Sequence, residues 1–386
     1  MKLLLRRLML GLLALSLLIA GITAFTPQGR AAVKTALFIP QVLPKIPFKP
    51  QTWVTGDPVW QKIRFPQAHG EGVADLITPA GEGKHSAVLF FTGVVVDNPR
   101  NDPRMVNLAE GLARSGMVVM IPWMDTQEKQ HIVVDDIDNL VHAFQFLRSH
   151  ESVDPNKVGM GGICTGASMA TVAAQDERIR RQVVFVNFFA GYYDAVDFAR
   201  AIGSRSRFYQ NDYVAPWEPD DLTLRVMRYH LIDGVSNQKD KIRLIAMYFP
   251  KDNAQPPQPI FESDEGRAVH RLLNGVSYEE VDELMTYLSP KTMEFLRTVS
   301  PSTKIDRLEA RVLMMHDRGD KLVPSEESRR FADALGRDSD TYHTEFSLFQ
   351  KQIQMHVDES VDVDAFGFVK EAYKLSLHIY NIMRDL

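Results

Sequence analysis

The chain has 386 residues, of which 45% are hydrophobic and 24% charged, the balance of an ordinary globular protein. Its net charge of −5 is spread without long runs, and basic residues are not interleaved with aromatic ones, so we expect no nucleic-acid partner. The single cysteine, Cys164, excludes an internal disulfide and is either a small buried apolar residue or a reactive thiol.

The first residues have the pattern of a membrane-targeting segment. Lys2, Arg6 and Arg7 precede an apolar stretch, residues 8–25, which is about as long as the roughly 17–25 residues that span a bilayer. No A-x-A cleavage site follows directly, so residues 1–30 are predicted to be a signal anchor, with a cleaved signal peptide as the alternative. The basic flank then predicts a membrane-anchored protein with its main domain extracytoplasmic, or a secreted one if the segment is cleaved.

A proline-rich stretch comes next, and residues 31–56 are predicted to be a linker. Pro40, Pro44, Pro47 and Pro50 lie close together, and proline at this density opposes a helix and favours extended chain. The apolar residues of the stretch either rest on the membrane surface or pack on the globular domain, and the sequence favours neither.

From residue 57 to residue 386 the chain is predicted to form one α/β domain. Strand-like and helix-like segments alternate, which predicts a mostly parallel central sheet with helices on both faces. The expected strands are residues 59–64, 72–78, 87–92, 117–121, 158–163 and 183–189, and the expected helices are residues 103–115, 133–149 and 165–175.

The alternation stops over residues 195–305, which are charged, proline-rich and mostly helical in pattern. We predict a cap inserted into the sheet domain, with a plain surface excursion as the alternative. The earlier rhythm then returns, with expected strands at residues 310–315 and 341–348 and expected helices at residues 325–335 and 363–384.

Cys164 lies at the predicted junction of a strand and a helix, flanked by Gly162 and Gly166. This is the G-x-nucleophile-x-G arrangement of a nucleophile elbow, in which a sharp turn requires neighbours without bulk. The start of the helix is expected to lower the pKa of the thiol. Ser168 is a rival nucleophile, but its position inside the helix disfavours it.

A thiol nucleophile needs a base and an acid, and in this arrangement they follow it as acid, then histidine. We predict His356 as the base because it falls in the loop after the last expected strand, whereas His343 lies in that strand and His378 in the final helix. The predicted acid is Asp320, a few residues beyond a strand, with Asp317 as the alternative.

An oxyanion formed during acyl transfer needs two backbone N–H donors. One is expected from Thr165, directly after the nucleophile. The other is expected from the loop after the strand that ends near Thr92, where Val94 is preferred over Gly93.

These motifs resemble the dienelactone hydrolase branch of the α/β-hydrolase superfamily. The resemblance rests on residues 153–167, which match that family's turn, strand and cysteine elbow, on the acid loop at residues 316–324, and on His356 as the terminal histidine. It covers roughly residues 58–195 and 305–386.

The resemblance implies hydrolysis of an ester, lactone or thioester through an acyl-cysteine, with a small-molecule acyl substrate and with neither a metal nor an organic cofactor. Three features depart from the family: Asp317 stands where a glycine is usual, the insertion at residues 195–305 is long, and the chain has an N-terminal anchor. An acyltransferase using the same cysteine and an inactive membrane-tethered binding protein on a hydrolase fold remain alternative functions. The acyl group and the oligomeric state are not defined by the sequence.

Overall fold

The fold is described from a computed structural model of the chain, which describes residues 21, 26–43, 46–94, 99–210, 213–250, 257–336, 340–347 and 365–384. The predicted signal anchor falls almost wholly on residues 1–20 and 22–25, outside the described residues. Among the helices that are described, none is both long enough and apolar enough to cross a membrane.

An eight-stranded sheet forms the centre of the molecule, with strands in the order β1-β2-β4-β3-β5-β6-β9-β10. The pairings β1–β2 and β2–β4 are antiparallel, and the other pairings are parallel. The strands are β1 (Val59–Pro66), β2 (Glu71–Thr78), β3 (His85–Phe91), β4 (Met117–Trp123), β5 (Val153–Ile163), β6 (Phe185–Phe189), β9 (Arg311–Asp317) and β10 (Tyr342–Phe346). This order and these directions are those of an α/β-hydrolase-like fold, and they confirm the predicted mostly parallel sheet.

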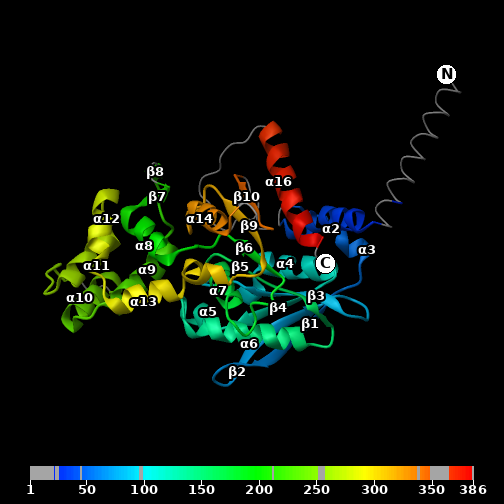
Figure 1. Ribbon diagram of the computed structural model, residues 1–386, viewed down its shortest axis with the longest axis horizontal. Helices are drawn as coiled ribbons and strands as arrows, with labels where there is room; N and C mark the ends of the chain where they lie inside the picture. The colour runs from blue at the N-terminus through cyan, green and yellow to red at the C-terminus, as the bar shows by residue number, and fades with distance from the viewer. Residues whose placement is uncertain are drawn as a thin grey trace.

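Helices cover both faces of the sheet, as predicted (Figure 1). On one face the core includes α6 (Asp135–Ser149), α7 (Thr165–Ala174) and α14 (Glu326–Leu335), and on the other α2 (Pro27–Val42), α4 (Pro103–Arg114) and α16 (Ala365–Met383). Two short elements, η1 (Pro99–Asn101) and α5 (Asp125–Lys129), lie in the connections. The inner strands β3 and β4 are buried along nearly their whole length because helices lie on both sides of them.

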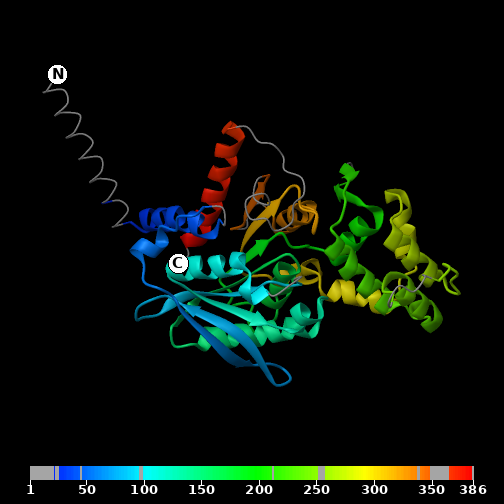
Figure 2. The same cartoon turned by 180° about the vertical axis from the view of Figure 1, so that it is seen from behind.

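The segment after β6 leaves the sheet and forms a separate helical lobe (Figures 1 and 2). It consists of α8 (Ala195–Ser204), the hairpin β7 (Ser206–Tyr209) and β8 (Tyr213–Pro216), α9 (Asp221–Gly234), α10 (Gln238–Tyr248), α11 (Asp264–Asn274), α12 (Tyr278–Met285), α13 (Pro290–Thr298) and η2 (Pro301–Arg307). We call this lobe the cap. The hairpin was not expected from the sequence.

The prediction of extended chain after the anchor is wrong for residues 27–42, which form helix α2. Thr26 caps the helix by accepting a hydrogen bond from the N–H of Gly29, and Pro27 stands in its first turn, where a missing N–H is harmless. Pro40 lies in the last turn, and the ammonium of Lys49 donates to the carbonyl oxygens of Pro40, Gln41 and Leu43 at 2.8 to 3.0 Å. Helix α2 forms because it packs against α4 and α16 and because Lys49 caps its last carbonyl groups. These two contributions outweigh the destabilisation of the helix by Pro40.

Candidate active site

Cys164 occupies the sharp turn between β5 and α7. Its backbone has φ 53° and ψ −132°, a conformation that non-glycine residues rarely adopt and that costs about 1–3 kcal/mol. The N–H of Cys164 donates to the carbonyl oxygen of Phe189 at 2.9 Å, which ties the turn to the end of β6. The residue therefore has the strained strand-to-helix geometry that a nucleophile elbow requires.

The glycines around the turn are needed because three backbone segments approach one another here. A Cβ added at Gly166 would lie 2.2 Å from the carbonyl oxygen of Phe91, and one at Gly162 would lie 2.6 Å from the backbone of Gly166. Gly93, at φ +68°, lies in the same close backbone contact, since a Cβ there would lie 2.2 Å from the backbone nitrogen of Gly166. The start of α7 is thus packed directly against the loop that follows β3.

The thiol of Cys164 is partly exposed in a cavity at the carboxyl edge of the sheet. Burial raises its pKa to about 12, and the nearby carboxylates of Asp320 and Asp220 add to the effect. The N–H of Thr165 donates toward the sulfur and lowers the pKa, but not enough to offset the burial. The helix start therefore lowers the pKa of the thiol as predicted, but burial and the two carboxylates outweigh it, and the net shift is upward.

The rival nucleophile Ser168 is fully buried inside α7. Its hydroxyl donates to the carbonyl oxygen of Tyr192 at 2.7 Å, so it is engaged in holding the helix to the loop after β6. It does not line the cavity that Cys164 enters.

The acid loop follows β9 directly. Asp320 is buried, and its Oδ1 accepts hydrogen bonds from the N–H groups of Leu322 at 2.7 Å and Val323 at 3.1 Å. Burial raises the pKa of this carboxyl to about 7, against the opposing effect of those two N–H donors. Asp320 is also close enough to raise the pKa of Cys164, whereas the Oδ1 of Asp317 accepts a hydrogen bond from the N–H of Gly319 at 2.8 Å.

The predicted base, His356, lies in the segment 348–364, outside the described residues. The two other late histidines are both engaged elsewhere. His343 on β10 pairs its Nε2 with the hydroxyl of Ser328 at 3.0 Å, and His378 is buried on α16 with its Nδ1 3.3 Å from the hydroxyl of Thr344. Neither side chain lines the cavity beside Cys164.

The two predicted oxyanion donors lie where the start of α7 packs against the loop after β3. The N–H of Thr165 points to the sulfur of Cys164, and the N–H of Val94 donates to the hydroxyl of Thr165 at 2.9 Å. In the resting protein the donor of Val94 is therefore occupied by a side chain, which an oxyanion would have to displace.

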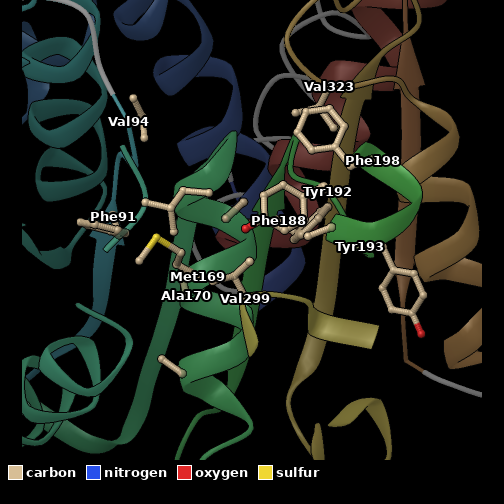
Figure 3. Packing of buried hydrophobic residues seen from close by; sticks show 14 of the residues in the cluster. Phe91, Val94, Met169, Ala170, Phe188, Tyr192, Tyr193, Phe198, Val299 and Val323 are labelled. Carbon is tan, nitrogen blue, oxygen red and sulfur yellow. The ribbon is translucent and has the colours of Figure 1, made fainter. Parts of the chain in front are cut away.

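The cavity above the thiol is almost entirely apolar, and most of its wall comes from the cap. It is narrow, with a volume of about 50 Å³, and lies between the elbow and helices α8, α9 and α13. The cap residues that line it include Phe198, Ile202, Val226, Met227, Phe295 and Leu296. Figure 3 shows Phe91 and Val94 on one side of Met169 and Ala170 of α7, and Phe188, Tyr192 and Phe198 on the other.

Hydrogen bonds join the cap to the acid loop, three of them to carbonyl oxygens of residues 320–322. The indole N–H of Trp217 donates to the carbonyl oxygen of Asp320 at 2.8 Å. The hydroxyl of Thr223 donates to the carbonyl oxygen of Leu322 at 2.9 Å. The N–H of Asp220 donates to the carbonyl oxygen of Lys321 at 2.8 Å. The cap therefore positions both the apolar wall and the loop that carries Asp320.

Two titratable residues of the cavity, Tyr192 and His230, were not anticipated from the sequence. Tyr192, after β6, is fully buried with a hydroxyl that has no hydrogen-bond partner among the described residues, and burial raises its pKa. His230, on α9, accepts a hydrogen bond from the N–H of Ile132 at 3.1 Å, and burial lowers its pKa to about 3. The position of Tyr192 could have been predicted, because parallel strands end at one edge of a sheet and Tyr192 follows β6, the strand beside the one that ends at Cys164.

Comparison with solved structures finds proteins of a similar fold at low identity. The Pyrobaculum calidifontis hyperthermophilic esterase is 11% identical with a TM-score of 0.45, and the alignment covers 92% of each chain. Porphyromonas gingivalis dipeptidyl peptidase 4 is 10% identical with a TM-score of 0.49, over 86% of this chain and 36% of that one. Pyrococcus horikoshii acylaminoacyl peptidase is 12% identical with a TM-score of 0.45, over 82% of this chain.

This chain spans less than half of the acylaminoacyl peptidase, 45% of its length. No protein-family model matches the chain, and no curated protein matches it either. At these identities and TM-scores the similarity concerns the fold and carries no residue roles to this chain.

Proposed function

We propose that this protein is an acyl hydrolase, similar to the dienelactone hydrolase branch, that cleaves an ester, lactone or thioester through an acyl-cysteine on Cys164. The observation that carries the proposal is the strained conformation of Cys164, whose thiol enters an apolar cavity directly beneath the cap. Strain of this kind is retained where the surrounding structure holds it in place, and it is typical of catalytic positions.

The first step is nucleophilic attack by sulfur on the acyl carbonyl carbon. Because burial keeps the thiol protonated at neutral pH, a base has to remove the proton as the S–C bond forms. We assign this role to His356, and we assign to Asp320 the task of orienting the imidazole and stabilising its charged form. The charge on the imidazolium would in turn favour ionisation of the buried Asp320 carboxyl.

The tetrahedral intermediate carries a negative oxygen, which we place between the N–H groups of Thr165 and Val94. Collapse of the intermediate breaks the bond to the leaving group, which takes the proton from His356 and departs as an alcohol or thiol. Water then attacks the thioester with His356 as base, releasing the carboxylic acid and restoring the Cys164 thiol. The balanced reaction adds one water to the acyl bond.

The substrate we propose has an apolar acyl group. The lining side chains from the cap offer an acyl chain hydrophobic contact rather than hydrogen bonds, and the small volume of about 50 Å³ favours a short acyl group unless the cap moves. We also propose that the enzyme acts outside the cytoplasm, held at the membrane by residues 1–30, because of the basic flank and apolar stretch there.

The test is turnover of a series of p-nitrophenyl esters and acyl thioesters by the full chain, with Cys164→Ala as the matched inactive variant. We expect release of acid by the wild-type protein, a covalent acyl adduct on Cys164 detectable by mass spectrometry, and no adduct with the variant. Equal turnover by Cys164→Ala would refute the proposal. Adding amine and alcohol acceptors tests the acyltransferase alternative, in which the acyl group would leave on the acceptor instead of water.

A further inference from the structure

The most exposed large hydrophobic side chains are concentrated on two helices. On α3 (Gln51–Val54) and α16, five such residues are 64 to 79% exposed: Trp53, Val54, Phe366, Val369 and Tyr373. Elsewhere in the described part of the chain, only Ile260 in the cap reaches a comparable exposure, at 63%. Scattered single residues of this kind are ordinary, but clusters mark an interaction surface.

Both helices lie against α2. In Figures 1 and 2, α16 stands across α2 while α3 lies beside it, and α2 contacts both helices. Phe48, stacked on Trp53 with ring centroids 5.9 Å apart, extends the apolar group next to α3. We call this side of the molecule, formed by α2, α3 and α16, the α2 face.

The place where α2 begins indicates what the face contacts. Helix α2 starts at Pro27, immediately after the apolar residues 8–25 that are long enough to span a bilayer. If that stretch enters a membrane, the α2 face is held within a short distance of the lipid at all times. A tether of this kind gives the face a high effective concentration at the bilayer, so weak contacts suffice to dock it.

The polar groups of the α2 face also suit a lipid surface. Trp53 and Tyr373 belong to the residue types that gather at membrane interfaces. Arg30 and Lys34 lie one helical turn apart on α2. Burial lowers the pKa of Lys34, and the nearby charges of Lys157 and Arg30 lower it further. Such a group of cations attracts anionic headgroups.

We propose that the α2 face is a membrane-docking surface, on which Trp53 and Phe366 enter the headgroup region of the bilayer that holds residues 8–25. The docked face lies on the side of the sheet opposite α6 and α7. This inference requires the membrane segment but is independent of the chemistry proposed for Cys164.

The test places a polarity-sensitive nitrobenzoxadiazole dye at single positions of the full-length chain. In a Cys164→Ala background, Trp53→Cys and Phe366→Cys carry the dye on the α2 face, and Ile260→Cys carries it at an equally exposed site in the cap. Each protein is reconstituted into phosphatidylcholine vesicles with and without phosphatidylglycerol. We expect blue-shifted emission and quenching by doxyl-labelled lipid at positions 53 and 366, stronger with phosphatidylglycerol, and neither effect at position 260.

Water-like emission at positions 53 and 366 in vesicle-bound protein would overturn the proposal, as would a protein that does not float with the vesicles. A blue shift that appears in detergent without vesicles and grows with protein concentration would identify a second copy as the partner and also overturn it. Should a labelled variant fold poorly, quenching of the native Trp53 by brominated lipid, with Trp53→Phe as its control, makes the same measurement. The labelled proteins carry Cys164→Ala and are inactive by design, so these emission measurements do not depend on the proposed function, which is tested separately by acyl turnover of the wild-type chain.

Discussion

Substitution of Gly166 by alanine is a direct test of the elbow. In most helices Gly→Ala is stabilising by up to about 1 kcal/mol, because glycine loses more backbone freedom on folding. At Gly166 we expect the opposite sign, since the added Cβ would lie 2.2 Å from the carbonyl oxygen of Phe91 and 2.5 Å from the backbone nitrogen of Gly93. Both contacts are with backbone, which cannot rotate away as a side chain could.

The expected magnitude follows from the movement required. Relieving the contact means separating the start of α7 from the loop after β3 by about 1 Å, and a misplacement of that size costs about 10²-fold in rate at an active site. The same movement separates the N–H of Thr165 from that of Val94. The crowding should also destabilise the fold by about 1–3 kcal/mol.

The assay measures kcat/KM with a short p-nitrophenyl ester and Tm by calorimetry. Gly336→Ala is the matched control, because Gly336 has φ +76° but an added Cβ there meets nothing within 4 Å. We expect this control to lose about 1–2 kcal/mol from backbone strain and to keep its kcat/KM. If Gly166→Ala matched the wild-type protein in both Tm and kcat/KM, the close crossing of α7 and the β3 loop would be wrong.

Four further outcomes are expected. His356→Ala should lower kcat by at least about 10²-fold through loss of the base, whereas His343→Ala should retain it; equal losses in the two would argue against His356. Asp320→Asn should abolish most turnover yet have a higher Tm than the wild-type protein, by a margin that grows with pH. The reason is that a carboxyl with a pKa near 7 in the folded state favours folding below about pH 3.8 and loses that advantage as pH rises through 7. A Tm difference between the two proteins that stays constant from pH 4 to pH 8 would contradict the burial of the Asp320 charge. Val226→Trp should fill part of the cavity and reduce kcat/KM for octanoyl esters far more than for acetyl esters, which a series of chain lengths measures. Alkylation of Cys164 by iodoacetamide in the His356→Ala protein should still accelerate above pH 9, and a plateau below pH 8 would show a low-pKa thiolate instead.

Several features of the fold could be predicted from the sequence because they depend on local pattern. The apolar runs that became β3 and β4 are continuous, since strands covered on both sides need no polar alternation. The elbow at Cys164 was predictable from Gly162 and Gly166, because only residues without a side chain allow the backbone approach that the structure has there.

Other features depended on partners distant in the chain. The helix at Pro27–Val42 was mistaken for extended chain because its stability comes from α4, α16 and the ammonium of Lys49, none of which is visible in the local proline pattern. The net upward shift of the Cys164 pKa was missed for the same reason. The helix start is local, whereas the burial and the carboxylates that raise the pKa come from the cap and the acid loop.

What the sequence by itself determined is therefore the alternation of strands and helices in the sheet domain, the glycine-flanked turn at Cys164 and the chain order of its proposed partners. Tertiary structure alone decided the apolar character of the cavity, the resting bond between Val94 and Thr165, and the buried hydroxyl of Tyr192 beside the thiol. The physical reason is that periodicity and turn chemistry are properties of neighbouring residues, while burial and electrostatic environment are set by segments that meet only when the chain has folded.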